Sequence, residues 1–251
     1  MIKLHNGDCL EVMKTIESGS IDAIITDPPY GTTTCKWDSV IDFNLMWEQL
    51  NRIIKPNGAI VLFGSEPFSS ALRMSNINNY KYDWIWEKDK GSNIGASRKQ
   101  PLKKTENIIV FYSKQPFYNY KGDLLDKPIT RVLPNKKSET SSLSSKNIGS
   151  DKREYTTYTH KTKTNVIYSK RDNQFGKSLH PTQKPVALME YLIKTYTKEN
   201  ETVLDFTMGS GSTGVACKNT NRNFIGIEQN EKYFKIAKER IEHVPSQQKM
   251  F

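Results

Sequence analysis

The sequence predicts an α/β protein with a doubly wound, mostly parallel sheet and a small basic insert. Three observations support this fold class. Strand and helix patterns alternate in residues 1–112 and again in residues 179–251. The strand patterns are short, nearly continuous apolar runs, which are typical of strands buried on both faces of a parallel sheet. Residues 113–178 separate the two regions and show neither pattern.

The first region, residues 1–112, reads as strands and helices in alternation. A turn at KPNG, residues 55–58, precedes one of the strands. Residues 89–104 contain glycines and basic residues without periodicity, so they predict a mobile loop, and a loop this long is often functional. The predicted strands are 2–5, 21–26, 59–63, 82–88 and 106–112, and the predicted helices are 8–16, 43–54 and 67–75.

The last region, from residue 179 onward, completes the predicted sheet. The run TVLDF, residues 202–206, predicts a strand, and the following GSGSTG predicts a glycine turn that opens a helix. A further strand is expected at residues 224–228. The predicted helices of this region are 185–196, 212–219 and 231–243.

Residues 113–178 hold most of the positive charge of the chain. They contain 14 Lys or Arg and six Asp or Glu, an excess of eight in a chain whose net charge is +10. Aromatic residues lie among these charges, and a solvated linker rarely contains so many. This combination favours an insert that binds nucleic acid. A basic linker in a generally lysine-rich chain is the alternative.

Composition also disfavours several classes of protein. No run approaches the roughly 20 apolar residues of a membrane-spanning helix, and the N-terminus lacks the apolar run of a signal peptide. The three cysteines and four histidines show no metal-ligand spacing. The sequence therefore predicts a cytoplasmic protein without a membrane segment, a disulfide framework or a bound metal.

The glycine turn predicts a ligand site. Gly209, Gly211 and Gly214 match G-x-G-x-x-G, a pattern that lets the backbone approach a ligand at a helix N-terminus. Glu228 ends the next strand, where an acid can accept hydrogen bonds from ribose hydroxyls. The pattern fits NAD, FAD or S-adenosylmethionine, and a purely structural turn is the alternative.

The late position of this turn indicates a circularly permuted order of elements. Only one strand and one or two helices follow the turn, so the rest of the sheet must come from residues 1–112. Ligands of open α/β sheets lie beyond the carboxyl ends of strands at the switch point of the sheet. We therefore expect the strands that end at Asp27 and Asp205 to be neighbours.

Several stretches of the chain together match the motif order of one known family. They are NGDCLEVMK, DPPY, LNRIIKPNGAIVLF, TENIIVF, HPTQKP and DFTMGSGSTG, followed by GIE. In this combination the chain resembles the β class of amino-methylating DNA methyltransferases. The resemblance implies a seven-stranded, permuted sheet of the S-adenosylmethionine-dependent methyltransferase type. It assigns residues 1–112 to the catalytic part, 113–178 to target recognition and 179–251 to cofactor binding.

One stretch departs from the family pattern. Members usually have D-P-F-x-G-x-G, whereas in this chain Phe206 is displaced by one position and Thr207 stands in place of the aromatic residue. The glycines are intact, so the resemblance still implies cofactor binding. A packing role against the cofactor is not expected of residue 207.

The resemblance implies roles for individual residues. Asp27 and the Pro28 carbonyl would accept hydrogen bonds from an exocyclic amine, and Pro29 would help to stiffen the turn. Tyr30 would stack on a base that is flipped out of the duplex, and Lys184 would pair with the carboxylate of the cofactor. The remaining cofactor-binding candidates are Asp8, Cys9, Thr182, Asp205, Thr207, Gly209, Ser210, Gly211, Ser212, Thr213 and Glu228.

Basic residues in the predicted loop and in the insert are the candidate DNA contacts. Their side chains can neutralise phosphates of the duplex. They are Arg98, Lys99, Lys136, Lys137, Lys152, Arg153, Lys161, Lys163, Lys170 and Arg171.

The implied reaction is methyl transfer from S-adenosylmethionine to double-stranded DNA, which leaves S-adenosylhomocysteine and needs no metal. Aspartate in DPPY favours N6 of adenine, since cytosine N4 enzymes of the family more often have serine there. The alternatives are cytosine N4 methylation, methylation of RNA or of a protein amide, a catalytically silent DNA-binding relative and a nicotinamide oxidoreductase. The family also allows a cognate restriction endonuclease as partner, and either a monomer or a homodimer.

Overall fold

The structure is a computed structural model, and it describes residues 1–31, 39–132, 155–172 and 183–244. The chain divides into two compact units. Unit 1 comprises Met1–Asn119 and Asn165–Phe251, and unit 2 comprises Tyr120–Thr164. Unit 2 lies inside residues 113–178, the range expected for the insert. Residues 113–119 and 165–178 belong to unit 1 instead.

Unit 1 contains one mixed sheet in which the C-terminal strands lie between the N-terminal ones. Five of its seven neighbouring pairs are parallel, and only β3–β5 and β4–β5 are antiparallel. The permuted order is therefore confirmed. Across the sheet the strands are β1 (Ile2–Asn6), β10 (Asn223–Glu228), β9 (Thr202–Asp205), β2 (Ile21–Thr26), β3 (Ile54–Gly64), β5 (Lys103–Phe111), β4 (Tyr80–Ser92) and β8 (Val166–Ser169).

The sheet has eight strands in the described part of the chain, one more than the seven that the resemblance implies. The additional strand is β8, which pairs with β4 in parallel at the edge of the sheet. Its four residues include only one that is buried, Ile167. Such a short, mostly exposed strand has no hydrophobic pattern. The sequence-based prediction therefore assigns these residues to the insert and not to the sheet.

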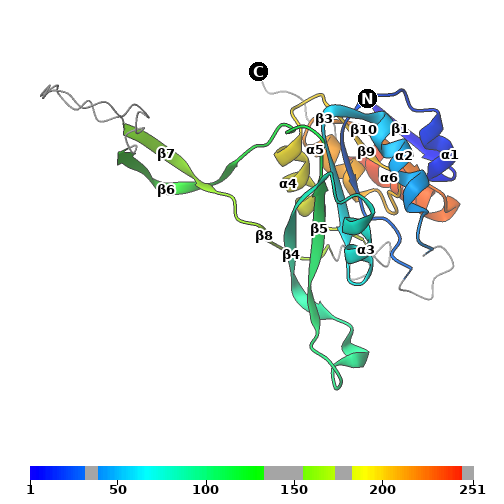
Figure 1. The fold of residues 1–251 in the computed structure, drawn as a ribbon, viewed down its shortest axis with the longest axis horizontal. Coiled ribbons are helices and arrows are strands. Elements are labelled where there is room, and N and C mark those ends of the chain that lie inside the picture. Colours follow the sequence, from blue (N-terminus) through cyan, green and yellow to red (C-terminus); the bar gives the residue numbers. More distant parts are fainter. Residues whose placement is uncertain (32–38, 133–154, 173–182, 245–251) are drawn as a thin grey trace, which may run out of the picture. The chain divides into compact units, whose positions relative to one another are not determined.

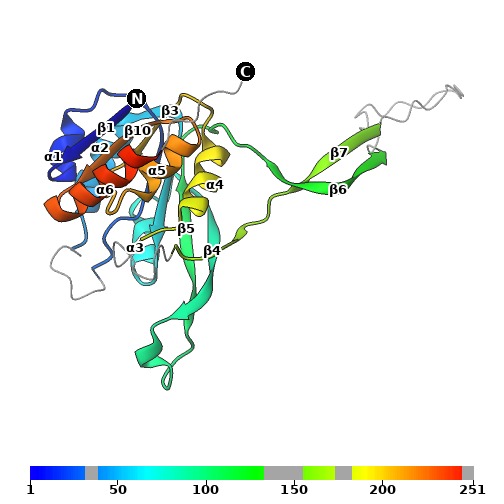
Figure 2. The same cartoon turned by 180° about the vertical axis from the view of Figure 1, so that it is seen from behind.

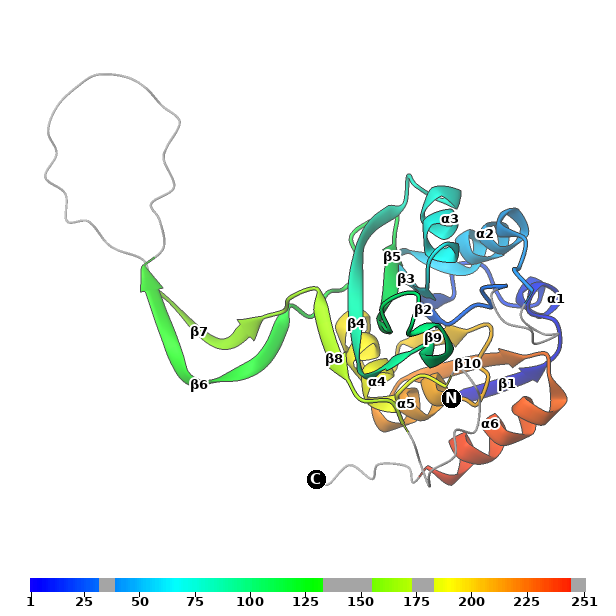
Figure 3. The same ribbon diagram turned by 90° about the horizontal axis from the view of Figure 1, so that it is seen from below.

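Helices cover both faces of this sheet (Figures 1 to 3). The side chains of β2 show why, because Ala23 and Ile25 pack with one group of helices and Ile24 packs with the other. Both groups bury an apolar stripe against the strands. One face carries α1 (Cys9–Lys14), α2 (Phe43–Ile53) and α3 (Phe68–Ser75), and the other carries α4 (Val186–Tyr196), α5 (Ser212–Asn219) and α6 (Glu231–His243).

Residues 89–104 form the outer end of a β-hairpin, so the loop there is shorter than predicted and spans residues 93–102. β4 continues to Ser92, a short 3-10 turn follows at Ile94–Ala96, and β5 begins at Lys103. The last residue of β3 pairs with Asn107, so the hairpin extends beyond the carboxyl end of β3 (Figure 1). The two strands satisfy their backbone groups by pairing with each other. They therefore need no apolar run that a sequence pattern could reveal.

Unit 2 is a two-stranded antiparallel ribbon of β6 (Lys121–Val132) and β7 (Tyr155–Thr162). Most of its described side chains are exposed, including Leu124 and Tyr158. The sequence predicts no strand here because a ribbon with two exposed faces lacks the apolar alternation of a sheet packed on a core. Across the described parts of both units, no helix has the length and apolar character needed to cross a membrane.

Candidate active site at the carboxyl edge of the sheet

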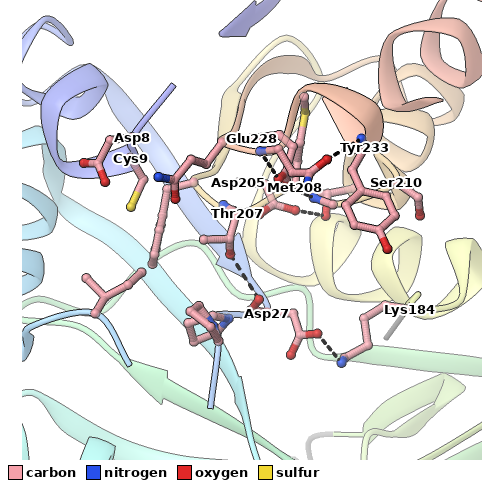
Figure 4. A pocket seen from close by; sticks show the side chains of 18 of the residues that line it. Asp8, Cys9, Asp27, Lys184, Asp205, Thr207, Met208, Ser210, Glu228 and Tyr233 are labelled. Atoms are coloured by element: carbon pink, nitrogen blue, oxygen red, sulfur yellow. Dashed lines mark hydrogen bonds and ion pairs between the residues drawn. The ribbon is translucent and has the colours of Figure 1, made fainter. Parts of the chain in front are cut away.

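A cavity of about 640 Å³ opens where the carboxyl ends of β1, β10, β9 and β2 meet (Figure 4). The chain leaves β9 toward one edge of the sheet and β2 toward the other, so the switch point lies between these two strands. Loops that follow parallel strands at a switch point diverge and leave room for a ligand. β2 and β9 pair directly, which confirms that the strands ending near Asp27 and Asp205 are neighbours.

Asp27 lies at the end of β2 with both carboxylate oxygens engaged. Its Oδ1 accepts a hydrogen bond from the Tyr30 hydroxyl at 2.5 Å, and its Oδ2 accepts one from Lys184 Nζ at 2.5 Å. The Tyr30 ring is stacked on Phe68, with 5.0 Å between the ring centroids. Burial raises the pKa of Asp27, and the Lys184 ammonium opposes this shift.

Thr207 fixes the backbone of the same turn. Its hydroxyl donates a 3.0 Å hydrogen bond to the carbonyl of Asp27 (Figure 4). The residue that departs from the family pattern therefore connects the loop after β9 to the turn after β2. Phe206 instead points into the core and is 1% exposed, although it also contributes to the cavity wall.

Lys184 lies at the cavity, but its ammonium faces carboxylates of this chain. Besides Asp27, Nζ lies 3.5 Å from Glu106 Oε2 on β5. Glu106 also accepts a 3.0 Å hydrogen bond from Lys88 on β4. Lys184 in turn lies over two aromatic rings, 5.0 Å from the centroid of Phe63 and 6.0 Å from that of Tyr30.

Asp205 connects three elements beneath the cavity. It accepts hydrogen bonds of 2.5 Å from the hydroxyls of Thr26 at the end of β2 and of Thr213 in α5. The Thr207 backbone N–H donates to it at 3.2 Å. Burial raises the pKa of this carboxyl to about 6. Asp205 thus ties the two loops of the switch point to the first turn of α5.

The glycine turn after β9 requires glycine for two different reasons. Gly211 has φ +80° and a Cβ there would lie 3.0 Å from the Cβ of Ala237 in α6. Gly214 lies inside α5, where an added Cβ would collide with Ile241 and lie 2.7 Å from Phe224. The first glycine therefore permits the turn, and the second lets α5 pack closely against α6 and β10.

Glu228 faces this turn from the end of β10. Its Oε2 accepts a 2.9 Å hydrogen bond from the Gly209 N–H, and its Oε1 accepts one of 2.8 Å from the Asn230 N–H. Burial raises the pKa of Glu228. Both oxygens are thereby oriented at the mouth of the cavity, where the pattern placed an acid for ribose hydroxyls.

Most of the predicted site residues line this one cavity. Asp8 does so while its side chain caps α1, accepting from the Leu10 N–H at 2.9 Å. Gly211 is not among the lining residues, and Thr182 lies outside the described residues. The predicted residues on the wall are Asp8, Cys9, Asp27, Pro28, Pro29, Tyr30, Lys184, Asp205, Thr207, Gly209, Ser210, Ser212, Thr213 and Glu228.

Sequence reasoning missed several residues around the site. Met208, Gln183 and Tyr233 line the cavity, and Glu106 lies behind Lys184. Glu106 offered a signal, because it is a charged residue at the start of an otherwise apolar strand run. Within the described ranges, no group of three or more His, Cys, Asp or Glu side chains could hold a metal ion.

The candidate DNA contacts are divided between the two units. Arg98 and Lys99 are exposed at the tip of the β4–β5 hairpin, and Lys170 is exposed after β8. Arg171 instead forms a 3.2 Å ion pair with Asp89. The other candidates belong to unit 2, where Lys161 and Lys163 lie on or just after β7, whereas Lys136, Lys137, Lys152 and Arg153 lie outside the described residues.

Known proteins share both the sequence pattern and this fold. A family model described as DNA methylase (N6_N4_Mtase) matches residues 21–239. Type II methyltransferase M.HpaI from Haemophilus parainfluenzae is 29% identical over 255 residues, covering 96% of this chain and 74% of the relative. Type II methyltransferase M2.DpnII from Streptococcus pneumoniae is 28% identical over 272 residues, covering 96% of this chain and 90% of the relative.

Solved structures give the same picture. A complex of M1.HpyAVI with S-adenosylmethionine matches with a TM-score of 0.64 and 29% identity, covering 96% of this chain and 99% of that one. The cytosine-N4-specific PvuII DNA methyltransferase matches with a TM-score of 0.67 at 16% identity, covering 95% and 86%, which shows a shared fold. Because the family model extends over most of the sequence and the fold agrees with it, the chain belongs to the N6/N4 family of DNA methylases.

Proposed function

We propose that this protein transfers a methyl group from S-adenosylmethionine to N6 of adenine in double-stranded DNA. The observation that carries the proposal is the position of Asp27. Its carboxylate lies at the end of β2, beside the glycine turn after β9, and both line the same cavity. An acceptor for an amine and a turn for a nucleoside cofactor thus meet at one switch point.

The residues around the glycine turn fit S-adenosylmethionine. Glu228 is held by the N–H groups of Gly209 and Asn230, so its carboxylate is oriented to receive ribose hydroxyls. The backbone at Gly209 and Gly211 has positive φ, which brings the chain close to a ligand. M1.HpyAVI, a structural relative at 29% identity, has been solved with this cofactor.

The turn after β2 suits an amine that is a weak nucleophile. The adenine amine shares its lone pair with the ring, so it reacts poorly unless acceptors hold its N–H bonds and draw the nitrogen toward tetrahedral geometry. The Asp27 carboxylate and the Pro28 carbonyl are the acceptors we assign to this role. Pro28, Pro29 and the Thr207 hydrogen bond to the Asp27 carbonyl hold the turn in place before the base arrives.

Bond changes in the transfer follow from this arrangement. S-adenosylmethionine supplies the methyl group: the N6 lone pair forms the new N–C bond while the C–S bond breaks and its electron pair stays on sulfur. The methylated amine then loses one proton, for which the Asp27 carboxylate is the nearest acceptor in the proposed arrangement. The amine is inaccessible in a duplex, so the base must be flipped into the cavity, where Tyr30 lines the wall.

The choice of adenine rests on aspartate at position 27, because the resemblance associates serine there with cytosine N4. The fold does not separate the two, since the cytosine-N4-specific PvuII enzyme shares it. We expect N6-methyladenine after incubation of the protein with S-adenosylmethionine and duplex DNA of mixed sequence, measured by mass spectrometry of the digested nucleosides. N4-methylcytosine as the product would contradict the choice of base, and methylation of RNA alone would contradict the choice of substrate.

DNA binding is expected to involve the β4–β5 hairpin and unit 2. Replacing Arg98 and Lys99 by glutamine should weaken DNA binding and flatten its salt dependence, by about 0.9 in log–log slope for each phosphate that the variant no longer neutralises. Replacing Lys161 of unit 2 by glutamine should likewise weaken DNA binding and flatten its salt dependence. A salt series of fluorescence-anisotropy titrations measures the slope of each variant.

A matched control removes two charges elsewhere. Lys14 and Lys235 are exposed helix residues, each paired with a glutamate, at 2.6 Å and 2.7 Å. Their replacement by glutamine should leave the slope unchanged. An equal loss of slope in this control would mean that overall charge, rather than the hairpin, sets the affinity. A cognate endonuclease as in Type II systems, the oligomeric state and a cytoplasmic location stay predictions.

A further inference from the structure

Four charged side chains form a buried chain of alternating sign that ends at Asp27. Lys88 Nζ lies 3.0 Å from Glu106 Oε1, Glu106 Oε2 lies 3.5 Å from Lys184 Nζ, and Lys184 Nζ lies 2.5 Å from Asp27 Oδ2. Their side chains are only 8–17% exposed. The four residues come from β4, β5, the segment before α4 and the end of β2, so the fold assembles this chain from distant parts of the sequence.

The arrangement places Lys184 in competition with the proposed substrate. Both oxygens of Asp27 already accept hydrogen bonds, one from Tyr30 and one from Lys184. Each carboxylate oxygen can accept a second hydrogen bond, but an oxygen that an ammonium already holds is a weaker acceptor for the amine and for its proton. The Tyr30 ring is stacked on Phe68 and is held in place. Lys184 carries its ammonium on a flexible four-carbon stem, so it is the donor that can withdraw.

Glu106 offers the place to which Lys184 can withdraw. In the described part of the chain, its Oε2 is buried and has no hydrogen-bond partner, and it lies 3.5 Å from the ammonium. Its other oxygen is held by Lys88. A buried ammonium must keep a counter-ion, and a short movement from one carboxylate to the other satisfies this. The rings of Phe63 and Tyr30 face the same ammonium.

We propose that Lys184 moves from Asp27 to Glu106 when the base enters, and that Glu106 and Lys88 are positioning residues for methyl transfer. The ammonium then holds Asp27 in place in the absence of DNA and releases one oxygen to the amine. This inference rests on the proposed function, because it needs an amine that enters beside Asp27. It adds two residues, on β4 and β5, to which the resemblance assigned no role, although Glu106 belongs to the TENIIVF stretch.

The first test is single-turnover methyl transfer by Glu106→Gln at saturating cofactor. This change keeps the size of the side chain but removes the charge that receives Lys184, so we expect transfer to slow by about 10²-fold. Cofactor affinity, measured by calorimetry, should stay within about threefold, since Glu106 does not line the cavity. An unchanged rate in Glu106→Gln would overturn the proposal.

The same two strands supply a matched control. Glu87 on β4 and Lys104 on β5 form a 2.7 Å ion pair whose side chains are 38% and 52% exposed. Glu87→Gln should transfer methyl groups at the wild-type rate. An equal loss in this control would assign the effect to the stability of the hairpin and would overturn the role of Glu106.

A double variant separates positioning from a simple imbalance of buried charge. Glu106→Gln leaves Lys88 buried without its carboxylate, which could disturb the hairpin by itself. Lys88→Met combined with Glu106→Gln removes both charges. We expect the double variant to fold and bind cofactor but to remain slow, because Lys184 still has no second carboxylate. Recovery to the wild-type rate would overturn the proposal.

The pH dependence of transfer gives a readout that a purely structural role would not move. The groups that face Asp27 are Tyr30 from its own turn, Lys184, Glu106 from β5 and Asp205 from β9. Burial raises the pKa of Asp27, the Lys184 ammonium lowers it and the Glu106 carboxylate raises it. Removing either neighbour therefore shifts this pKa in a direction that can be stated beforehand.

Asp27 must be ionised to accept the amine, so its pKa sets the acidic limb of the pH–rate profile. Lys184→Met should move this limb to higher pH, and Glu106→Gln should move it to lower pH. Shifts in the same direction, or no shift in either variant, would contradict the proposal. If the wild-type protein methylates no nucleic acid, the proposed function is wrong. If the wild type is active but the Lys184→Met and Glu106→Gln variants have the same transfer rate and pH–rate profile as the wild type, only the proposed movement of Lys184 is wrong.

Discussion

Replacing Asp27 by alanine is expected to lower the rate of methyl transfer to duplex DNA by at least about 10³-fold. The variant loses the carboxylate that directly follows β2, and the Pro28 carbonyl alone cannot hold both N–H bonds of the amine. Cofactor affinity should stay within about threefold, because the glycine turn and Glu228 are held by other contacts. Single-turnover transfer and calorimetry measure the two effects separately.

The surroundings of Asp27 make this variant easy to interpret. Lys184 keeps Glu106 as a counter-ion at 3.5 Å, so the substitution does not leave a buried ammonium unpaired. Asp22→Asn is the matched control, since Asp22 lies near the amino end of the same strand and pairs with Lys55 at 2.6 Å. A rate near that of the wild type in Asp27→Ala would show that the carboxylate is not the acceptor. Asp27→Asn tests the charge, because the amide keeps one acceptor oxygen.

The sequence predicted the elements that build the switch point because these are buried on both faces. β2 and β9 are short runs rich in apolar residues. Asp27 directly follows β2 and Asp205 ends β9, so both the strands and their functional ends were visible. The pairing of β2 with β9 followed from the late position of the glycine turn and is confirmed. A hydrophobic pattern in a sequence indicates burial, and here the candidate site lies at the ends of buried strands.

The hairpin and the buried ionic chain were not predictable in the same way. β4 and β5 continue past the core as a ribbon whose outer part is polar, so no apolar pattern marks Lys103 or Ser92 as strand residues. The pairing of Lys184 with Asp27 joins residues that are 157 positions apart. A motif assigns Lys184 to a cofactor, whereas only the fold shows which carboxylates lie within reach of its ammonium.

Glu228→Ala is expected to weaken binding of S-adenosylmethionine by about 10²-fold, the loss of one or two hydrogen bonds to a charged group. The carboxylate both orients the Gly209 N–H and faces the cavity, so its removal loosens the turn and deletes the proposed ribose contact. Methyl transfer should recover partly at high cofactor concentration, because Asp27 is untouched. Calorimetry gives the affinity, and KM against kcat for the cofactor gives the recovery.

Glutamine at position 228 should rescue little of this affinity, which distinguishes the mechanism from a loss of size. Oε2 accepts from the Gly209 N–H and Oε1 from the Asn230 N–H. In either orientation of a glutamine amide, its NH₂ group would therefore face one of these backbone N–H donors and lose that hydrogen bond. Glu231→Ala is the matched control, since Glu231 begins α6 nearby and pairs with Lys235 at the surface.

Because burial raises the pKa of Glu228, protonation should remove its acceptor capacity at a higher pH than for an ordinary glutamate. Cofactor affinity in the wild type should therefore fall as the pH is lowered through that raised pKa, and this dependence should disappear in Glu228→Gln. A Glu228→Gln variant that binds as tightly as the wild type would assign the ribose contact to another group.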